Sequence, residues 1–155
     1  MKKYIILPAV ILSLIFNQCT AENRDPKGTK SEVNETGNVA ELTDDSFKEL
    51  IFDYEANKEW NYEGSKPAII DFYADWCAPC RQLSPLVEEI AKEYSGRIDI
   101  FKVDTEKERM LTRVIGVSAL PTLLFIPAEG SPQFTVGVLP KESLLKAINE
   151  ILLVE

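Results

Sequence analysis

The chain has 155 residues, about the length of one domain, and its composition of 45% hydrophobic and 27% charged residues is globular rather than disordered. Acidic residues outnumber basic ones by 25 to 17, so the formal net charge is −8 and a nucleic-acid partner is not expected. Histidine is absent, which excludes serine–histidine and cysteine–histidine catalysis, histidine-ligated metal sites and pH switching by imidazole.

The first 21 residues are predicted to be a secretory signal peptide. Two lysines precede an apolar run from Tyr4 to Phe16, and this run is shorter than the roughly 20 residues that a membrane-spanning helix needs. Two fates are open: lipidation of Cys19, which would make the protein a lipid-anchored lipoprotein, or ordinary cleavage after Ala21. Both predict export to the periplasm, an oxidising compartment in which thiol–disulfide chemistry takes place.

Residues 22–40 are predicted to be a flexible linker. They are rich in Asn, Gly, Thr, Lys and Glu and contain one large aliphatic residue, Val33, so they cannot bury enough apolar surface to fold. The folded domain is therefore predicted to cover residues 41–155.

The first part of this domain predicts a helix followed by a buried strand. Thr43 is a typical N-cap for the first helix. Residues 53–66 have no clear periodicity, but Trp60 and Tyr62 indicate that this segment packs on the body of the domain. The nearly continuous apolar run AIIDFYA at 68–74 predicts a strand covered on both faces.

A second strand is predicted at residues 98–103, after a helix that ends at Gly96. Thr105 and Glu108 have the spacing of a capping box and predict that another helix begins there, with Gly116 after its end. The buried side of that helix is expected to carry Leu111, Val114 and Ile115.

Residues 122–126 and 133–138 predict a β-hairpin, and a last helix is predicted from about Pro140. A further strand of the same sheet is predicted near residues 39–42. This alternation of helices and strands predicts an α/β domain with a central mixed sheet of four to five strands and helices on both faces.

The chemistry is expected at Cys77 and Cys80, which are separated by two residues and lie between a buried strand and an amphipathic helix. The start of a helix favours an anion, and thiolate is the reactive form of cysteine. A zinc site would need four ligands, and the chain has one further cysteine, Cys19, and no histidine. A purely structural disulfide is the other alternative, although a bridge over so short a loop gains little stability from loop closure.

The chain resembles the thioredoxin family from about Glu41 to its C-terminus. The resemblance rests on separate motifs in a shared order: LTDDSF at 42–47, DFYADWCAPC at 71–80, Lys102, ALPT at 119–122 and Val136-Gly137. Three features depart from the family: Ala78 stands where glycine is usual, Arg81 replaces lysine, and the segment between Ser46 and Asp71 is longer. The resemblance implies the thioredoxin fold.

The resemblance also implies roles for individual residues. Cys77 would be the exposed attacking cysteine and Cys80 the resolving one. Asp71 interrupts an apolar strand, where burial raises the pKa of a carboxyl, and it would be the base for Cys80 with Lys102 as its partner. Pro121 would follow a cis peptide bond. The docking surface for substrate polypeptide would consist of Trp76, Ala78, Pro79, Leu120, Gly137 and Val138.

The charges near the cysteines predict a reductant. Strongly oxidising relatives carry a histidine between the cysteines, which stabilises the thiolate, whereas Ala78 and Pro79 have no charge. Asp71 and Asp75 oppose a negative sulfur, and Arg81 partly favours it.

The expected function is that of an exported protein-disulfide reductase that acts on disulfide-containing proteins as a monomer, without a metal or cofactor. In an exported setting it would need a membrane-bound thiol donor of electrons. The two alternatives are an exported disulfide oxidase or isomerase, disfavoured by the absent histidine, and a non-catalytic binding module, disfavoured by the intact cysteine pair.

Overall fold

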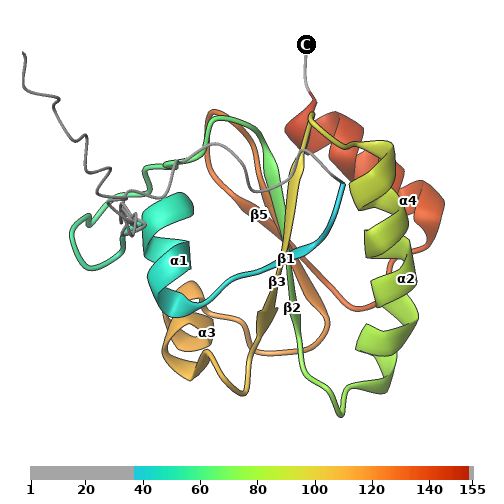
Figure 1. Ribbon diagram of the computed structural model, residues 1–155, viewed down its shortest axis with the longest axis horizontal. Helices are drawn as coiled ribbons and strands as arrows, with labels where there is room; N and C mark the ends of the chain where they lie inside the picture. The colour runs from blue at the N-terminus through green and yellow to red at the C-terminus, as the bar shows by residue number, and fades with distance from the viewer. Residues whose placement is uncertain (1–36, 154–155) are drawn as a thin grey trace, which may run out of the picture.

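Five strands form one mixed sheet in the order β1-β3-β2-β4-β5 (Figure 1). The structure is a computed structural model, and the residues that it describes are 37–153. The strands are β1 (Ala40–Glu41), β2 (Ala68–Tyr73), β3 (Asp99–Asp104), β4 (Thr122–Ile126) and β5 (Gln133–Val136). Strands β1, β3 and β2 are parallel, whereas β4 is antiparallel to both β2 and β5. The predicted hairpin and the further strand before residue 42 are both present.

Helices cover both faces of the sheet (Figure 1). On one face lie α1 (Asp44–Leu50) and α3 (Arg109–Ile115), and on the other α2 (Ala78–Glu93) and α4 (Lys141–Ala147), which continues as a π-helical turn, η1 (Ile148–Leu152). Each face has its own apolar core cluster. The predicted α/β class is therefore confirmed. None of the helices among residues 37–153 has the length and apolar character needed to cross a bilayer.

The central position of β2 places the cysteine pair at one end of the sheet. Residues 68–72 are all buried, because β2 lies between β3 and β4 and is covered by helices on both faces. Strands β2 and β3 are parallel, so their carboxyl ends lie at the same edge. The chain leaves β2 at that edge and enters α2 through a short turn.

The capping of α1 was predicted correctly, but that of α3 was not. Thr43 caps α1 in a capping box with Ser46. Thr105 instead donates its hydroxyl to the carbonyl of Tyr73, at 3.0 Å. Glu108 accepts from the backbone N–H of Asp44 at 2.9 Å, so its side chain caps α1, and α3 begins only at Arg109 without a side-chain cap. The sequence spacing could not reveal this long-range partner.

The predicted buried stripe of α3 was partly wrong. Leu111 is fully buried and Ile115 is partly buried, but Val114 is 45% exposed, and Met110, one turn earlier, is 58% exposed. A seven-residue helix places one narrow stripe against the core, and Leu111 and Ile115, one turn apart, occupy it. Gly116 ends the helix with a positive φ of 83°, as predicted.

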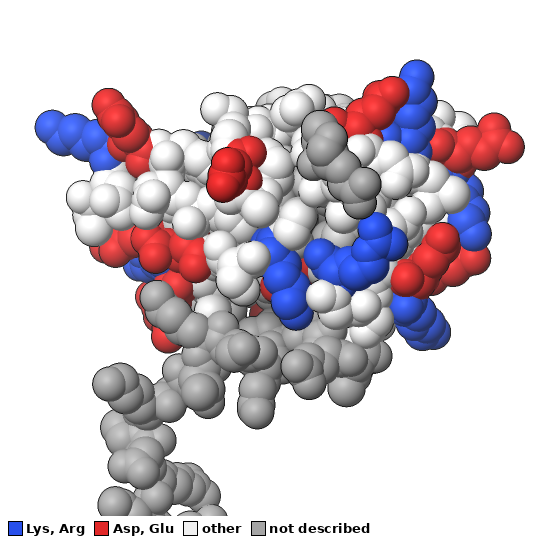
Figure 2. Space-filling model, turned by 90° about the horizontal axis from the view of Figure 1, so that it is seen from above, with Lys and Arg blue, Asp and Glu red and all other residues white. Residues whose placement is uncertain are grey.

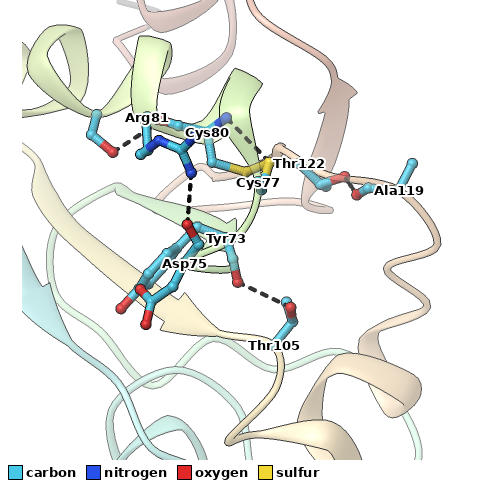
Figure 3. The surroundings of a disulfide bond; sticks show 9 residues. Tyr73, Asp75, Cys77, Cys80, Arg81, Thr105, Ala119 and Thr122 are labelled. Carbon is cyan, nitrogen blue, oxygen red and sulfur yellow. Dashed lines mark hydrogen bonds between the residues drawn. A yellow bond between two sulfur atoms is a disulfide. The ribbon is translucent and has the colours of Figure 1, made fainter.

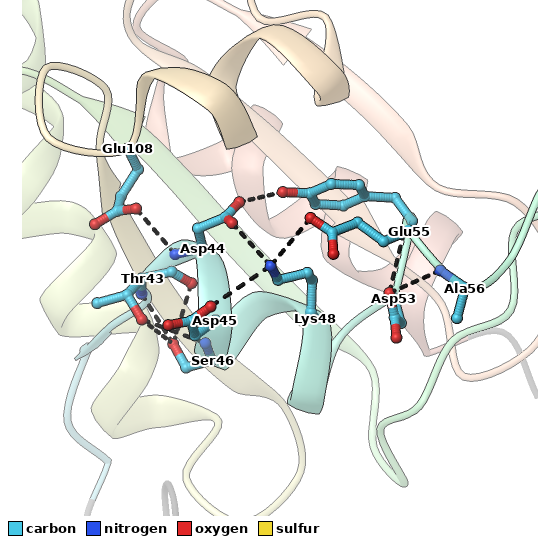
Figure 4. A network of polar contacts seen from close by, with 10 residues as sticks. Thr43, Asp44, Asp45, Ser46, Lys48, Asp53, Glu55, Ala56 and Glu108 are labelled. Atoms are coloured by element: carbon cyan, nitrogen blue, oxygen red, sulfur yellow. Dashed lines mark hydrogen bonds and ion pairs between the residues drawn. The ribbon is translucent and has the colours of Figure 1, made fainter.

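The segment between α1 and β2 packs on the domain, as Trp60 and Tyr62 indicated. The rings of Phe52 and Trp60 lie with their centroids 4.9 Å apart. Figure 4 shows how its first residues join α1 through a polar network, in which the Lys48 ammonium contacts Asp44, Asp45 and Glu55. The Tyr54 hydroxyl donates to Asp44, and burial together with that carboxylate raises the pKa of Tyr54 to about 12.

Replacing Gly64 with alanine is expected to destabilise the protein by about 1–3 kcal/mol. A Cβ at this position would lie 2.3 Å from the ring of Tyr62, and this half-buried ring is held by its hydroxyl, which donates to the Lys66 carbonyl at 2.6 Å. Urea denaturation measures the loss, with Ser65→Ala in the same segment as the matched control. Equal stability of the two variants would contradict the close packing of Tyr62.

The described chain begins at the end of the molecule opposite the cysteine pair. Residues 37–40 were assigned to the linker, but Gly37 is buried against the last turn of α2 and Ala40 pairs with Phe101 of β3. Figure 2 shows this end of the molecule, where basic and acidic side chains lie interspersed. The predicted signal peptide and most of the predicted linker lie outside the described residues.

Candidate active site

Cys77 and Cys80 form a disulfide where β2 gives way to α2 (Figure 3). The sulfur atoms are 2.09 Å apart and the Cα atoms 5.3 Å apart. The N–H of Cys77 donates to the carbonyl of Ala74, so a tight turn links the buried strand to the helix. The two cysteines therefore lie on the rigid part of the fold.

Cys77 is the N-cap residue of α2. Its Sγ accepts a hydrogen bond from the N–H of Cys80 at 3.2 Å, in the place that an oxygen takes in ordinary N-caps. Because α2 has 16 residues, its unpaired N–H groups and macrodipole favour a negative charge on that sulfur. This geometry lowers the cost of a Cys77 thiolate when the disulfide is reduced.

The expected exposure of Cys77 is wrong for the disulfide form. Cys77 is 3% exposed and Cys80 is 1% exposed, so burial does not distinguish the two sulfurs. The two cysteines form a buried cluster with Ala74, and Tyr73 and Leu120 pack against this cluster. The distinction rests instead on the position of Cys77 at the start of the helix.

Arg81 supports the turn before the helix. Its Nη1 donates to the backbone carbonyl of Asp75 at 2.8 Å, as Figure 3 shows. The guanidinium is thereby held near the first turn of α2, where it adds positive charge. Ser84 also contacts the site, because its hydroxyl donates to the carbonyl of Cys80 at 3.0 Å. Ser84 was not among the predicted site residues, although its position one helical turn after Cys80 indicated that it lies near the site.

Asp71 is a buried carboxyl on β2. It is 4% exposed, and its Oδ1 has no hydrogen-bond partner within the described residues. Burial raises the pKa of Asp71 from its ordinary value of 3.8 to about 7, and the charge of Lys102 opposes this only in part. A carboxyl with this pKa exchanges its proton near neutral pH, as a general base must.

Lys102 is the direct neighbour of Asp71 across the β2–β3 pair. Its ammonium does not form a salt bridge with that carboxylate, and it lies 5.7 Å from the centroid of the Tyr73 ring. Both residues line a cavity of about 400 Å³, together with Ser84 and Lys92 of α2. Lys102 therefore acts on Asp71 through its charge and not through contact.

The residues predicted to dock a substrate lie together around the disulfide. Trp76 is 67% exposed, and Ala78, Pro79 and Val138 are also exposed. Leu120 packs against the cluster that contains both cysteines, and its peptide bond to Pro121 is cis. The N–H of Gly137 donates to the carbonyl of Pro121 at 2.8 Å, which joins the end of β5 to this surface. Val136 is also exposed, but it was not predicted as a docking residue, because the hairpin pattern does not show which face of β5 is covered by the rest of the domain.

No group of three or more cysteine or acidic side chains in the described part of the chain is arranged to hold a metal ion. The two cysteines of the site are bonded to each other. The chemistry that this arrangement supports is reversible dithiol–disulfide exchange.

Comparison with known proteins gives a consistent result. The family model described as Thioredoxin matches residues 38–150. The thioredoxin of Borreliella burgdorferi is 48% identical over 109 residues, which cover 70% of this chain and 93% of that protein. Thioredoxin 1 of Nostoc sp. is 32% identical over 112 residues, covering 72% and 95%. The crystal structure of chloroplastic thioredoxin z is similar with a TM-score of 0.62 at 26% identity, over 74% of this chain and 94% of that one.

Proposed function

The chain belongs to the thioredoxin family and is a thiol–disulfide oxidoreductase with disulfide reductase activity; from this premise we propose that it is an exported reductase of protein disulfides. The observation that carries the proposal is the disulfide at the start of α2, with Cys77 as the N-cap and a buried carboxyl, Asp71, on the preceding strand. The relatives support the activity, and the N-terminal sequence before residue 38 supports export.

The proposed cycle starts from the reduced dithiol. The Cys77 thiolate attacks one sulfur of a substrate disulfide, and the other substrate sulfur leaves as a thiolate. Asp71 takes the proton of Cys80, whose thiolate attacks Sγ of Cys77 and releases the second substrate thiolate. The substrate thereby gains two electrons and, from solvent, two protons, while the Cys77–Cys80 disulfide forms.

A direct test is the reduction of insulin disulfides with dithiothreitol as the electron source. The wild-type protein is expected to accelerate insulin precipitation, and a variant with both Cys77 and Cys80 replaced by serine is expected to match the uncatalysed rate. An active double variant would show that the cysteine pair is not the catalytic group.

The reduction potential of the cysteine pair is expected to lie near that of thioredoxins, about −270 mV, and far from the value of about −120 mV found for a strong periplasmic oxidase. The N-cap position and Arg81 stabilise the thiolate, but the nearby carboxyls of Asp71 and Asp75 disfavour it, and no histidine adds to it. Equilibration with glutathione measures the potential. A value near −120 mV would make the protein a disulfide donor.

We also propose that a membrane-bound thiol donor supplies the electrons, and that the protein acts as a monomer. Export would place the reductase in an oxidising compartment, where the Cys77–Cys80 dithiol is not regenerated from the disulfide without such a donor. The redox state of Cys77 and Cys80 in intact cells tests this, with and without the host's transmembrane thiol-electron carrier. The pair is expected to become oxidised without the carrier, and a reduced pair would refute the donor.

The fate of the N-terminus is tested by the mass of the mature protein. Cleavage after Ala21 leaves an unmodified Glu22 at the start, whereas lipoprotein processing leaves a Cys19 that carries acyl chains. Retention of Met1 would contradict both forms of export.

A further inference from the structure

Strand β5 forms one edge of the sheet and lies next to the active site. It pairs with β4 on one side and with none of the other described strands on the opposite side. Its end leads to Gly137, which is hydrogen-bonded to Pro121, and the preceding Leu120 packs against the cluster that contains both cysteines. A polypeptide whose disulfide contacts Cys77 therefore comes close to this strand.

The hydrogen bond of Gly137 fixes which backbone groups of β5 remain free. In an antiparallel pair, residues alternate between two classes. In the first class the backbone N–H and C=O groups form hydrogen bonds with the partner strand, and in the second class these groups point away from it. The Gly137–Pro121 bond and the register Leu123↔Thr135 place Gly137 and Thr135 in the first class. The N–H and C=O groups of Phe134 and Val136 therefore point to the free side of the sheet.

The free edge is apolar and uncharged. Phe134 is 48% exposed and Val136 is 61% exposed, and both lie on the same face of the strand because they are two residues apart. No charged residue occurs from Gln133 to Val138 in a chain whose formal net charge is −8. Natural edge strands are usually protected by charges, bulges or covering segments, so a bare apolar edge beside a catalytic site indicates a partner.

We propose that β5 is a docking strand, to which an extended apolar segment of the polypeptide substrate adds as a sixth strand of the sheet. This inference rests on the proposed reductase function and names the substrate class: unfolded or loosely folded polypeptides with β-branched or aromatic residues near the reactive cysteine. Main-chain hydrogen bonds to Phe134 and Val136 would supply affinity, and their side chains would select apolar partners.

The reach of such a segment follows from strand geometry. A strand rises about 3.4 Å per residue, so Phe134 lies about 10 Å along β5 from Gly137. A substrate with only a few residues around its cysteine would contact the surface around Trp76 and Gly137 but not Phe134. Longer substrates would also use β5, and binding should therefore depend on the length of the substrate.

Amide hydrogen exchange in a trapped complex tests the proposal. The Cys80→Ser variant of the full protein is joined through Cys77 to a twelve-residue peptide of alternating Val and Thr, activated at its one cysteine with thionitrobenzoate. The amides of Phe134 and Val136 are expected to exchange rapidly in the free protein and at least ten-fold more slowly in the complex. The amide of Thr135, already bonded to β4, is the internal control and should be slow in both.

Three other outcomes would overturn the proposal in distinguishable ways. If the mixed disulfide forms but Phe134 and Val136 still exchange rapidly, the docking strand is wrong and the reductase function stands. If no thionitrobenzoate is released, the proposed function fails as well. If both amides are already protected in the free protein, and more so at higher protein concentration, the occupant of β5 is a second copy of this chain.

A pair of variants gives an independent measurement. In the wild type, the twelve-residue peptide is expected to have a lower KM than a four-residue peptide that is too short to reach Phe134. Phe134→Thr is expected to raise the KM for the twelve-residue peptide about five-fold, which removes most of this difference between the two peptides. Val114→Thr on α3, which alters a side chain of similar exposure away from β5, is the matched control. An equal KM for the long peptide in all three proteins would refute a role for Phe134.

Discussion

Replacing Asp71 with asparagine is expected to raise the free energy of unfolding by about 3 kcal/mol above pH 7. The pKa of this carboxyl is about 7 in the folded protein and 3.8 ordinarily, so the unfolded chain releases the proton at a lower pH than the folded protein does. The contribution of Asp71 to wild-type stability therefore falls as pH rises from about 4 to about 7, by about 4 kcal/mol in all. The variant avoids this loss, but its buried amide costs about 1 kcal/mol through imperfect hydrogen bonding, which leaves a net gain of about 3 kcal/mol.

The pH dependence is the decisive part of this experiment. Urea denaturation of the oxidised wild type and variant, from pH 4 to pH 9, should show a variant about 1 kcal/mol less stable than the wild type near pH 4. The variant should become the more stable protein as pH rises, by about 3 kcal/mol at a plateau above pH 7. Asp75→Asn is the matched control, because Asp75 is an exposed carboxyl four residues along the same segment. A difference that does not change with pH would mean that Asp71 titrates normally.

The same substitution is expected to slow the resolving step about 100-fold at pH 8, because an amide cannot accept the proton of Cys80. In the wild type this step should accelerate as pH rises through about 7, the pKa of Asp71. Stopped-flow release of the second substrate thiol measures it. An unchanged rate across this pH range would remove the assignment of Asp71 as the base, even if the stability prediction holds.

These two results together would explain why a destabilising group persists in the core. Asp71 lies between apolar neighbours on a fully buried strand, and Lys102 does not approach it closely enough for a salt bridge. A contact ion pair would restore the low pKa of an ordinary carboxylate and remove its ability to accept a proton near neutral pH. The separation of the two charges therefore leaves Asp71 able to accept a proton near neutral pH.

Local patterns in the sequence predicted much of the fold. The apolar run before Asp71, the Thr43 cap and Gly116 each act through neighbouring residues, and the structure has all three where they were expected. The errors concern long-range contacts. Glu108 caps a helix more than sixty residues earlier in the chain, and Val114 is exposed because Leu111 and Ile115 occupy the narrow stripe that α3 places against the core.

The chemistry of the candidate site was predicted from the sequence, but the solvent exposure of Cys77 was not. The spacing of the cysteines and the charges around them are properties of the sequence. The burial of Cys77 is not, because it depends on a tertiary contact: Leu120, from a distant turn, packs against the cluster that Ala74 forms with the two cysteines. The free side of β5 likewise depends on its pairing with β4. Tertiary contacts of this kind decide which surface a substrate meets.

The two cysteines are expected to give opposite results when each is replaced by serine. Cys80→Ser should form a stoichiometric mixed disulfide with substrate and then stop, which lowers multiple-turnover reductase activity by at least about 1,000-fold. Cys77→Ser should form no such complex. The physical reason is the position of Cys77 as the N-cap of α2, since exposures of 3% and 1% do not separate the two residues.

The measurement is single-turnover release of a coloured thiol, followed by mass spectrometry of the protein. One equivalent of thiol and an adduct on Cys77 are expected for Cys80→Ser, whereas Cys77→Ser should release thiol far more slowly. Ser84→Ala provides the matched control, because Ser84 contacts the Cys80 carbonyl but takes no part in the exchange. Should Cys77→Ser be the variant that traps substrate, Cys80 would be the nucleophile, and the helix N-terminus would not be what selects the attacking sulfur.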